Sequence, residues 1–255
     1  MIVSLQLFSS REQSDHGAVL RLLAQIGYDA VEGWAGAFGD DPAGYRGKLD
    51  QVGLKMPSVH IGLDELENAF EDSMATAHSL GVSSVYAPFL MPEDRPVDLA
   101  GWRALAGRLA ALNDEVRAAG FGFGWHNHDF EFVDLGGGMT PMQLLLDEAP
   151  GMDWEADLAW IVRGGHDPSD WIKRYGSRIT SVHVKDLAPS GQCLDEDGWA
   201  DAGHGTLPWG ELMAQVLAET PTQLLITEHD KPNDFARFAN RAFDFVQSAT
   251  GAARA

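Results

Sequence analysis

Residues 99–132 read LAGWRALAGRLAALNDEVRAAGFGFGWHNHDFEF, and this stretch contains the unit that repeats along the chain. Its first part, residues 99–119, repeats apolar side chains at the spacing of an amphipathic helix. Gly120 then suits a left-handed helix cap, and residues 121–126 form a short apolar run typical of a strand. The stretch therefore predicts a helix that ends at a glycine and leads directly into a strand.

The same alternation extends over the whole sequence. Strands are expected at residues 3–8, 29–32, 55–60, 84–89, 121–126, 154–158, 179–185 and 224–228. Helices are expected at residues 16–26, 45–52, 63–80, 99–119, 141–148, 168–175, 209–219 and 234–247. Helices end at glycines that fit left-handed caps: Gly27, Gly53, Gly81, Gly120 and Gly176. This order favours parallel strands joined by crossover helices.

Eight such units within 255 residues are the number that a (β/α)8 barrel needs. The competing fold is a doubly wound open sheet, whose first strand is followed by a glycine-rich phosphate-binding turn. Here the first strand leads into SLQLFSSRE, residues 4–12, which contains no glycine. We therefore predict an α/β fold with one (β/α)8 TIM-barrel domain over residues 1–255.

Composition excludes several classes of protein. With 45% hydrophobic and 22% charged residues, the chain lies outside the range of disordered proteins. Eighteen basic and 38 acidic residues give a formal charge of −20, which disfavours nucleic acid and anionic membrane as partners. Cys193 is the only cysteine, so no intrachain disulfide can form. No signal peptide or membrane-length apolar run is visible, so we expect a cytoplasmic protein with a small-molecule partner. Assembly into a homo-oligomer is left open.

Polar residues at the strand ends are the candidates for chemistry, because a TIM barrel places its active site there. The expected strand ends carry Glu32, His60, His126, His128, Glu131, Asp157, His183, Lys185 and Glu228. Burying such groups is unfavourable unless they are paired, bonded to metal or used in catalysis. A histidine with carboxylates from different strands is a mixed nitrogen and oxygen set, which suits Mn²⁺, Zn²⁺, Co²⁺ or Mg²⁺.

The motifs at these positions resemble those of a known superfamily. In chain order they are SLQLFSSR, GYDAVEGW, SVHIG, WHNHDFEF, DLAW, RITSVHVKD, GHGTLPW and ITEHD. Together they resemble the sugar phosphate isomerase/epimerase superfamily of xylose-isomerase-like barrels, and VHVKD and WHNHDFEF are the most specific. The His-Asn-His sequence at 126–128 resembles the branch of inosose dehydratases and keto-glycoside-processing enzymes.

The resemblance implies one divalent metal ion, held by residues from strands five to eight. Asp157, His183 and Glu228 match the ligands that the family takes from strands six, seven and eight. At strand five many members have a glutamate where this chain has His126, and Glu131 lies five residues further on. We assign Glu131 as the fourth ligand and His126 as an acid/base or substrate-contacting group. The reverse assignment of these two residues is left open.

Further catalytic roles follow from residue type. Histidine titrates near neutral pH, so His126 and His128 are candidates to transfer a proton. Glu228 is expected to serve catalysis as well as metal binding. Lys185 is expected either to bind a substrate oxygen or to pair with Asp186.

Four residues are expected to contact the substrate. His60 and Glu32 are placed in the lining of the pocket. Trp125 and Trp160 are placed against the substrate because they neighbour the candidate ligands. Trp160 also stands where ketose epimerases of this family carry a substrate-binding histidine, which argues against a simple ketose epimerase.

The expected function is that of a metal-dependent sugar isomerase or epimerase. Proton abstraction next to a metal-bound carbonyl gives an enediolate, and reprotonation isomerises or epimerises the sugar, keto-sugar or polyol-derived substrate. The alternative is a dehydratase, lyase or hydratase that acts on an inosose or 3-keto-glycoside. A non-catalytic sugar-binding barrel and an AP-endonuclease-like nuclease are weaker alternatives, the latter because of the acidic charge. No cluster of lysines and arginines marks a phosphate cradle, which favours an unphosphorylated substrate.

Overall fold

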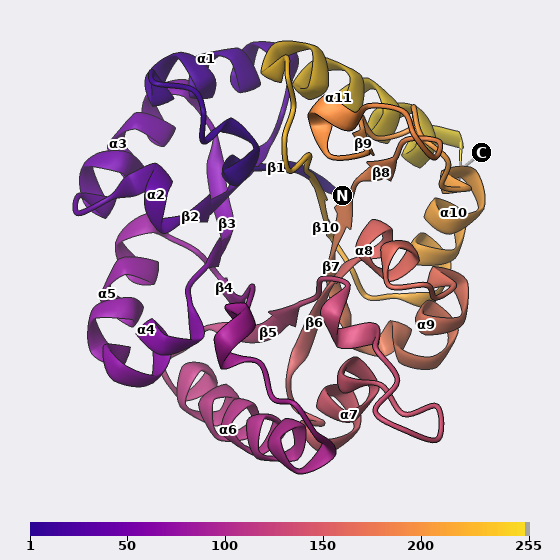
Figure 1. The fold of residues 1–255 in the computed structure, drawn as a ribbon. Coiled ribbons are helices and arrows are strands. Elements are labelled where there is room, and N and C mark those ends of the chain that lie inside the picture. The colour runs from indigo at the N-terminus through magenta and orange to yellow at the C-terminus, as the bar shows by residue number, and fades with distance from the viewer. Residues whose placement is uncertain (253–255) are drawn as a thin grey trace.

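Eight parallel strands close into a barrel that helices surround (Figure 1) in the computed structural model, which describes residues 1–252. The barrel strands are β1 (Ile2–Gln6), β2 (Ala30–Trp34), β3 (Lys55–His60), β4 (Ser84–Ala87), β5 (Gly122–His126), β6 (Asp153–Asp157), β7 (Ile179–Val184) and β10 (Leu224–Thr227). Each strand pairs with its neighbours in parallel, and β1 pairs with β10 to close the ring. The predicted (β/α)8 barrel is confirmed.

Helices follow the barrel strands as the sequence pattern predicts. They are α1 (His16–Ile26), α2 (Ala35–Phe38), α3 (Pro42–Val52), α4 (Leu63–Asn68), α5 (Phe70–Leu80), α6 (Leu99–Ala118), α7 (Pro141–Glu148), α8 (Leu158–Arg163), α9 (Pro168–Tyr175), α10 (Trp209–Glu219) and α11 (Phe235–Ala252). Asp98 directly precedes the stretch quoted above, and its side chain caps α6 by accepting from the backbone of Gly101. The helix then leads through Gly120 into β5, so this unit folds as expected.

Short elements lie in the loops, most of them at the carboxyl ends of the strands, whereas η4 directly precedes β7. Five are 3-10 turns: η1 (Leu7–Ser10), η2 (Pro92–Asp94), η3 (Phe130–Phe132), η4 (Gly176–Arg178) and η5 (Leu194–Glu196). Strands β8 (Asp186–Leu187) and β9 (Trp199–Ala200) form a small antiparallel sheet between β7 and α10. Asp186 holds this segment, since its carboxylate accepts from the backbone of Leu187, Gly203, Gly205 and Leu207.

Several expected elements have different bounds in the structure, among them the strands at 29–32 and 84–89, which span 30–34 and 84–87, and the helix at 45–52, which begins at Pro42. The helix expected at residues 63–80 is two helices, because Ala69 leaves the helical conformation with φ −138° between α4 and α5. The first strand ends at Gln6 rather than at residue 8, because the Gln6 side chain accepts from the backbone of Phe8 and caps η1. The last helix runs to Ala252 rather than to residue 247.

Most of the expected glycine caps are left-handed. Gly27, Gly53, Gly81 and Gly120 have φ values of 116°, 78°, 74° and 96°. Gly176 is an exception to the prediction, since its φ is −51° and the chain continues into η4. A glycine is needed there for packing, because a Cβ atom would lie 2.6 Å from the carbonyl oxygen of Glu219.

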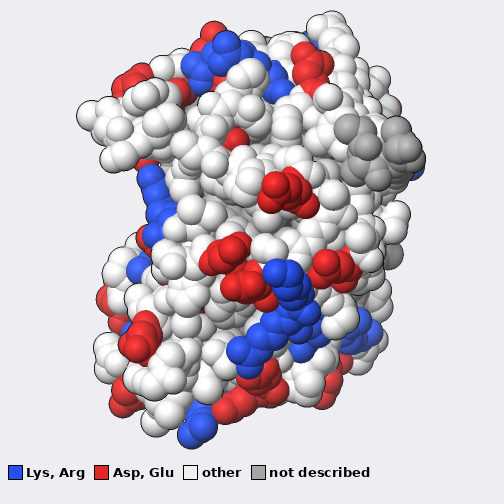
Figure 2. All heavy atoms as spheres, turned by 90° about the vertical axis from the view of Figure 1, so that its right-hand side faces the viewer, with Lys and Arg blue, Asp and Glu red and all other residues white. Residues whose placement is uncertain are grey.

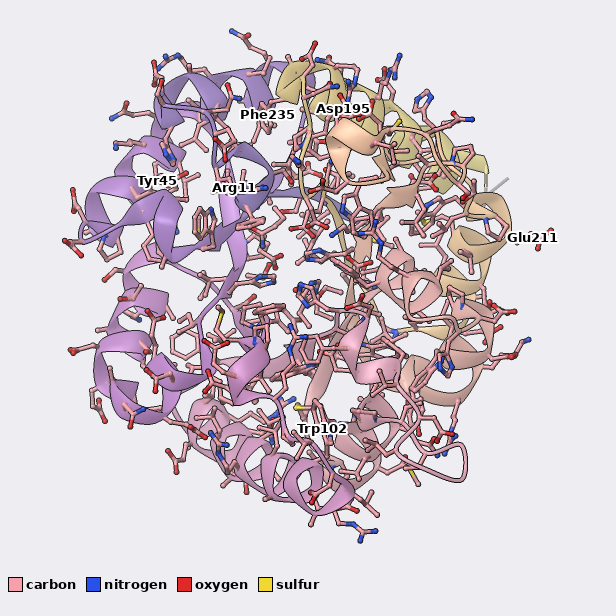
Figure 3. All side chains as sticks on the ribbon, viewed as in Figure 1. Arg11, Tyr45, Trp102, Asp195, Glu211 and Phe235 are labelled. Atoms are coloured by element: carbon pink, nitrogen blue, oxygen red, sulfur yellow. The ribbon has the colours of Figure 1, made fainter. Side chains whose placement is uncertain are left out.

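The apolar core lies between the barrel and its helices. Trp102 of α6 is buried on the inner side of its helix, whereas Glu211 of α10 points away from the barrel (Figure 3). The interior of the barrel is instead rich in buried polar residues. They are Ser4, Gln6, Glu32, Ser58, Glu155, Asp157, Ser181 and His183. Barrel interiors usually hold branched apolar side chains, so this polar interior marks the site.

The outer surface carries charges of both signs. On the side that bears α9, α10 and the end of the chain, neighbouring basic groups form one small cluster that acidic groups flank (Figure 2). Among residues 1–252, no helix is both long enough and apolar enough to cross a membrane.

Candidate active site

A cavity of about 520 Å³ opens at the carboxyl ends of the barrel strands. Its lining residues are Phe8, Trp34, Ala35, His60, Gly62, Asp64, Glu65, Pro88, Phe89, His126, His128, Glu228 and Asp230. One part of the lining is aromatic, and another part carries histidines and carboxylates. The lining contains neither lysine nor arginine.

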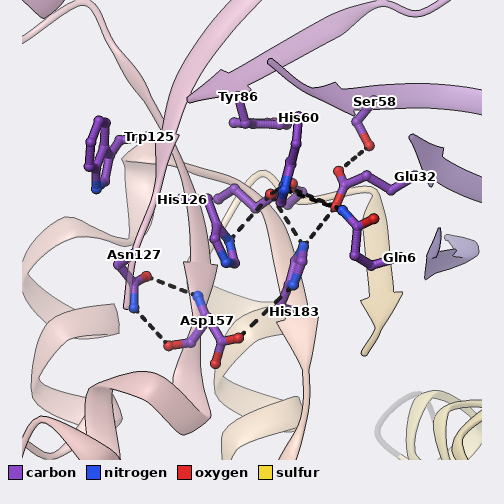
Figure 4. Close-up of polar contacts among 12 residues, drawn as sticks. Gln6, Glu32, Ser58, His60, Tyr86, Trp125, His126, Asn127, Asp157 and His183 are labelled. Atoms are coloured by element: carbon purple, nitrogen blue, oxygen red, sulfur yellow. Dashed lines mark hydrogen bonds and ion pairs between the residues drawn. The ribbon is translucent and has the colours of Figure 1, made fainter. Parts of the chain in front are cut away.

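Four side chains form what we call the outer ligand group: His126, Asp157, His183 and Glu228. Each offers one donor atom, and these atoms all lie within 4.8 Å of one another. His183 Nδ1 lies 2.9 Å from Glu228 Oε2 and 4.0 Å from Asp157 Oδ2 (Figure 4 shows the latter contact). The group comes from β5, β6, β7 and the residue after β10, so it assembles segments that are far apart in the sequence.

Hydrogen bonds to Asn127 and to the backbone of Trp160 fix the orientation of Asp157. The Asn127 amide accepts from the backbone of Asp157 at 3.0 Å and donates to its carbonyl oxygen at 3.1 Å (Figure 4). Asp157 Oδ1 caps α8 by accepting from the backbone of Trp160 at 2.9 Å. Asp157 Oδ2 is buried and has no hydrogen-bond partner within the described residues. Burial raises the pKa of Asp157 to about 6, against the opposing charges of Lys185 and His183.

Lys185 points into the site and does not pair with Asp186. Its buried Nζ lies 3.1 Å from Glu228 Oε2, 3.5 Å from Asp157 Oδ2 and 2.9 Å from Asp230 Oδ1. Burial lowers the pKa of Lys185, but these carboxylates outweigh it and hold the pKa above its usual value. Lys185 is therefore an ammonium group that holds carboxylates of the outer ligand group in place.

Glu131 lies outside the outer ligand group, contrary to our assignment. Its Oε1 accepts from Trp125 Nε1 and its Oε2 accepts from the backbone of His128, both at 2.9 Å. Because Glu131 follows β5 in the η3 turn, its carboxylate faces back toward its own loop. His126, the last residue of β5, occupies the strand-five position of the group. Burial raises the pKa of Glu131 to about 8.

His126 and His128 are both neutral imidazoles at neutral pH. Burial, followed by the charge of His183, lowers the pKa of His126 well below its usual value. Burial, followed by the charge of Lys185, has the same effect on His128. The His128 ring lies 4.9 Å from the Phe89 ring in the cavity wall, and its Nδ1 has no hydrogen-bond partner within residues 1–252.

The two tryptophans expected to contact substrate do not line the cavity. Trp125 is completely buried and its indole bonds to Glu131, away from the histidines (Figure 4). Trp160 packs edge-on against Trp199, with 4.7 Å between ring centroids. The aromatic residues that do line the cavity are Phe8, Trp34 and Phe89. Trp34 could have been predicted from the sequence, because it stands two residues after Glu32 and therefore lies on the same face of β2.

Below the cavity lies a second set of polar contacts. His60 reaches the cavity, whereas Glu32 is completely buried and lies 2.8 Å from His183 Nε2. Glu155, which the sequence analysis missed, lies 2.6 Å from His60 Nε2. It could have been found by alternation, because it stands two residues before Asp157 on β6. Burial lowers the pKa of His60, but Glu32 and Glu155 outweigh it and raise that pKa to about 10.

Histidines and carboxylates gather at the carboxyl end of a closed parallel barrel. The protein is therefore a TIM barrel with a candidate metal centre. The family described as xylose isomerase-like TIM barrel matches residues 20–248. The chain belongs to this family, as the motifs suggested.

Similar proteins carry names from sugar metabolism. An inosose dehydratase of Geobacillus kaustophilus (strain HTA426) is 26% identical over 191 residues, which cover 66% of this chain and 61% of that protein. The chain thus matches less than two thirds of the length of this relative. A sugar phosphate isomerase/epimerase of Parabacteroides distasonis ATCC 8503 has a TM-score of 0.80 and 22% identity, covering 96% of this chain and 97% of the other. An IolI protein with a binding zinc atom has a TM-score of 0.77 and 17% identity, covering 99% and 98%.

Proposed function

We propose that this protein is a divalent-metal-dependent sugar isomerase or epimerase that moves a proton next to a substrate carbonyl. The observation that carries the proposal is the outer ligand group, in which side chains from four strand ends place their donor atoms within 4.8 Å of one another. Two imidazoles and two carboxylates suit Zn²⁺, Mn²⁺ or Co²⁺. His126 and Glu228 also line the cavity, so an ion held there would be within reach of a substrate.

The residues present fit a metal ion. Asp157 Oδ2 and His126 Nδ1 are buried without hydrogen-bond partners among the described residues, and unpartnered buried polar atoms are unfavourable. A neutral His126 is in the protonation state that metal binding requires. When bound, a divalent ion supplies Lewis acidity that polarises a carbonyl and orients the adjacent hydroxyl.

The protein side chains would carry the proton. We assign His128 as the base that removes the proton from the carbon next to the carbonyl, because it lines the cavity as a neutral imidazole. Delivery of that proton to the neighbouring carbon would isomerise the substrate, whereas an epimer would need a second proton donor on the opposite face. Lys185 acts as a positioning residue through its contacts with Glu228 and Asp157. Phe89 and Trp160 flank His128, with ring centroids at 4.9 and 5.0 Å, and restrict its orientation.

The cavity favours an uncharged keto-sugar or inosose. Its lining has no lysine or arginine to bind a phosphate, and it includes four carboxylates that would repel one: Asp64, Glu65, Glu228 and Asp230. Phe8, Trp34 and Phe89 offer an apolar wall against the less polar face of a sugar ring.

A dehydratase is the second candidate. Removal of the same proton followed by loss of a hydroxyl group from the next carbon would release water from an inosose. The 26% identity to an inosose dehydratase, over about two thirds of this chain, favours this candidate.

Hydrogen exchange with solvent tests the proposal and separates the candidates. The metal-loaded protein is incubated in D2O with unphosphorylated ketoses and inososes, and proton NMR follows the position next to the carbonyl. We expect deuterium at that position, with an epimer or isomer as product, whereas a dehydratase would yield an unsaturated ketone. Asp157→Asn should lose the exchange, and His78→Gln, which changes an exposed histidine of α5, should keep it. Binding of these ligands without any exchange would contradict proton transfer.

A further inference from the structure

We propose that the barrel holds a second divalent cation beneath the outer ligand group. Its ligands are His60 Nε2, His183 Nε2, Glu32 Oε2 and Glu155 Oε2, which we call the inner ligand group. This site is defined by its own atoms and depends neither on the proposed reaction nor on an ion in the outer group.

Four contacts join the inner ligand group into a compact set (Figure 4). Glu155 Oε2 lies 2.6 Å from His60 Nε2 and 3.2 Å from His183 Nε2. Glu32 Oε2 lies 3.2 Å from His60 Nε2 and 2.8 Å from His183 Nε2. A tetrahedral ion with bonds of about 2.0 Å separates its ligand atoms by about 3.3 Å. Two imidazole nitrogens and two carboxylate oxygens therefore already stand at nearly the spacing of a tetrahedral site.

A fifth donor lies beside this set. His126 Nδ1 is 3.4 Å from Glu155 Oε2, and it has no hydrogen-bond partner among residues 1–252. The donor atoms of His60, His126, Glu155 and His183 all lie within 4.8 Å of one another. A buried, unpartnered nitrogen of the outer ligand group therefore lies beside the inner ligand group.

The carboxylates of the inner group are held by their second oxygens. Ser58 Oγ donates to Glu32 Oε1 at 2.5 Å, and Ser181 Oγ donates to Glu155 Oε1 at 2.7 Å. Both Oε2 atoms face the histidines, and Glu32 Oε2 also accepts from Gln6 Nε2 at 2.8 Å. Residues that fix the orientation of ligands in this way are a regular feature of protein metal sites.

Charge balance separates the inner group from the outer one. Glu228 and Asp157 of the outer group have the ammonium group of Lys185 beside them. Glu32 and Glu155 are completely buried, and within the described residues their ion pairs are only with histidines. Burial opposes protonation of His60, but Glu32 and Glu155 outweigh it and raise its pKa to about 10, so a divalent ion bound here would displace imidazolium protons.

His183 lies between the two groups and His60 gives access to the inner one. His183 directs Nδ1 toward Glu228 and Nε2 toward Glu32 and Glu155. To hold an ion in each group, His183 would have to lose both of its ring protons, so binding of two ions should depend on pH. His60 lines the cavity, so an ion can reach the inner group from there.

Counting ions in matched variants tests the proposal. The protein is stripped with a chelator, dialysed against Co²⁺, and analysed for metal per chain, while far-UV circular dichroism checks folding. We expect two ions in the wild type and in the control His78→Gln, and one ion in Glu155→Gln and in Glu32→Gln. Asp157→Asn should also retain one. Electron paramagnetic resonance should show coupled Co²⁺ ions in the wild type and an uncoupled ion in the single-site variants.

Each other result shows whether the inner site, the proposed function or both are contradicted. One ion in the wild type that survives Glu155→Gln and is lost in Asp157→Asn overturns the inner site and leaves the outer one. One ion that both substitutions remove overturns the two-ion arrangement in favour of a single ion between the groups. No bound ion at all contradicts both proposals. If the glutamine variants fail to fold, the number of ions bound per wild-type chain still tests the proposal, because two ions support the inner site and one ion contradicts it.

Discussion

Asp157 uses one carboxylate oxygen for structure and leaves the other for a ligand. Its Oδ1 caps α8 and its backbone is fixed by Asn127, while Oδ2 is buried without a hydrogen-bond partner in the described chain. Glu32 and Glu155 are held by both oxygens, since serines donate to their Oε1 atoms and histidines contact their Oε2 atoms. The orientation of the site thus depends on short-range hydrogen bonds around each carboxylate.

Glu228→Gln should abolish turnover without unfolding the protein. The amide keeps the size of the side chain but removes the negative charge beside His183 and Lys185. We expect kcat to fall on the order of 10²-fold or more, with a native far-UV spectrum. Activity near the wild-type level would remove Glu228 from the site.

His126→Asn and Glu131→Gln should differ in their metal content. His126 belongs to the outer ligand group, whereas both oxygens of Glu131 are occupied by donors from Trp125 and His128. We expect His126→Asn to bind metal more weakly and Glu131→Gln to retain it. Metal loss in Glu131→Gln alone would restore Glu131 as the strand-five ligand.

The buried carboxyl of Glu131 should make stability depend on pH. Its pKa is raised from 4.5 to about 8, so between these pH values the folded protein holds a proton that the unfolded chain releases. The free energy of unfolding should therefore fall as pH rises through this window, by an amount on the order of 4 kcal/mol.

Urea titrations of metal-free protein at pH 5, 6.5 and 8 measure this effect. Glu131→Gln cannot ionise, so the difference between wild type and variant isolates the contribution of Glu131. Equal pH dependence in the two proteins would show that Glu131 is not the group responsible.

The strands and helices were predictable because their patterns are local. Amphipathic spacing, capping residues and glycines defined most elements, and alternation predicted that His183 and Lys185 share a face. Alternation also opposed our placement of Trp125, since it neighbours the inward-facing His126 on β5 and must point outward. The contact of Glu155 with His60 joins β6 to β3 across the barrel. It depends on barrel closure and register, which no local pattern carries.

The neighbouring strands β4 and β6 pack closely against the backbone of Gly124 in β5. A Cβ atom there would lie 2.7 Å from the Asp153 carbonyl oxygen and 2.7 Å from the Tyr86 ring. We expect Gly124→Ala to lower the free energy of unfolding by about 1–3 kcal/mol, because β5 must shift.

Gly107→Ala provides the matched control. Gly107 is exposed within α6 and its Cβ would meet nothing within 4 Å, so alanine should stabilise the helix by about 0.5–1 kcal/mol. Chemical denaturation measures both variants. An unchanged stability of Gly124→Ala would show that the close approach is easily relieved.

At the scale of the whole molecule, the barrel brings the ends of distant strands to one mouth. A site of this kind couples metal binding to folding, because the unfolded chain cannot present the same ligands together. The acidic charge of −20 acts in the same direction by attracting cations to the protein.

Metal removal should therefore lower the melting temperature. At a free ion concentration 100 times Kd, one bound ion stabilises a protein by about 2.7 kcal/mol. We expect a chelator to lower Tm, added Zn²⁺ or Co²⁺ to restore it, and Asp157→Asn to gain less from the ion than His78→Gln. Equal gains in both variants would place the stabilising ion elsewhere.

The most direct test of the central claim is an anomalous difference map from crystals grown with Zn²⁺ and measured at its absorption edge. The account predicts a peak about 2.0–2.2 Å from donor atoms of His126, Asp157, His183 and Glu228. A map without a peak at this position, with the four side chains turned away from one another, would contradict it.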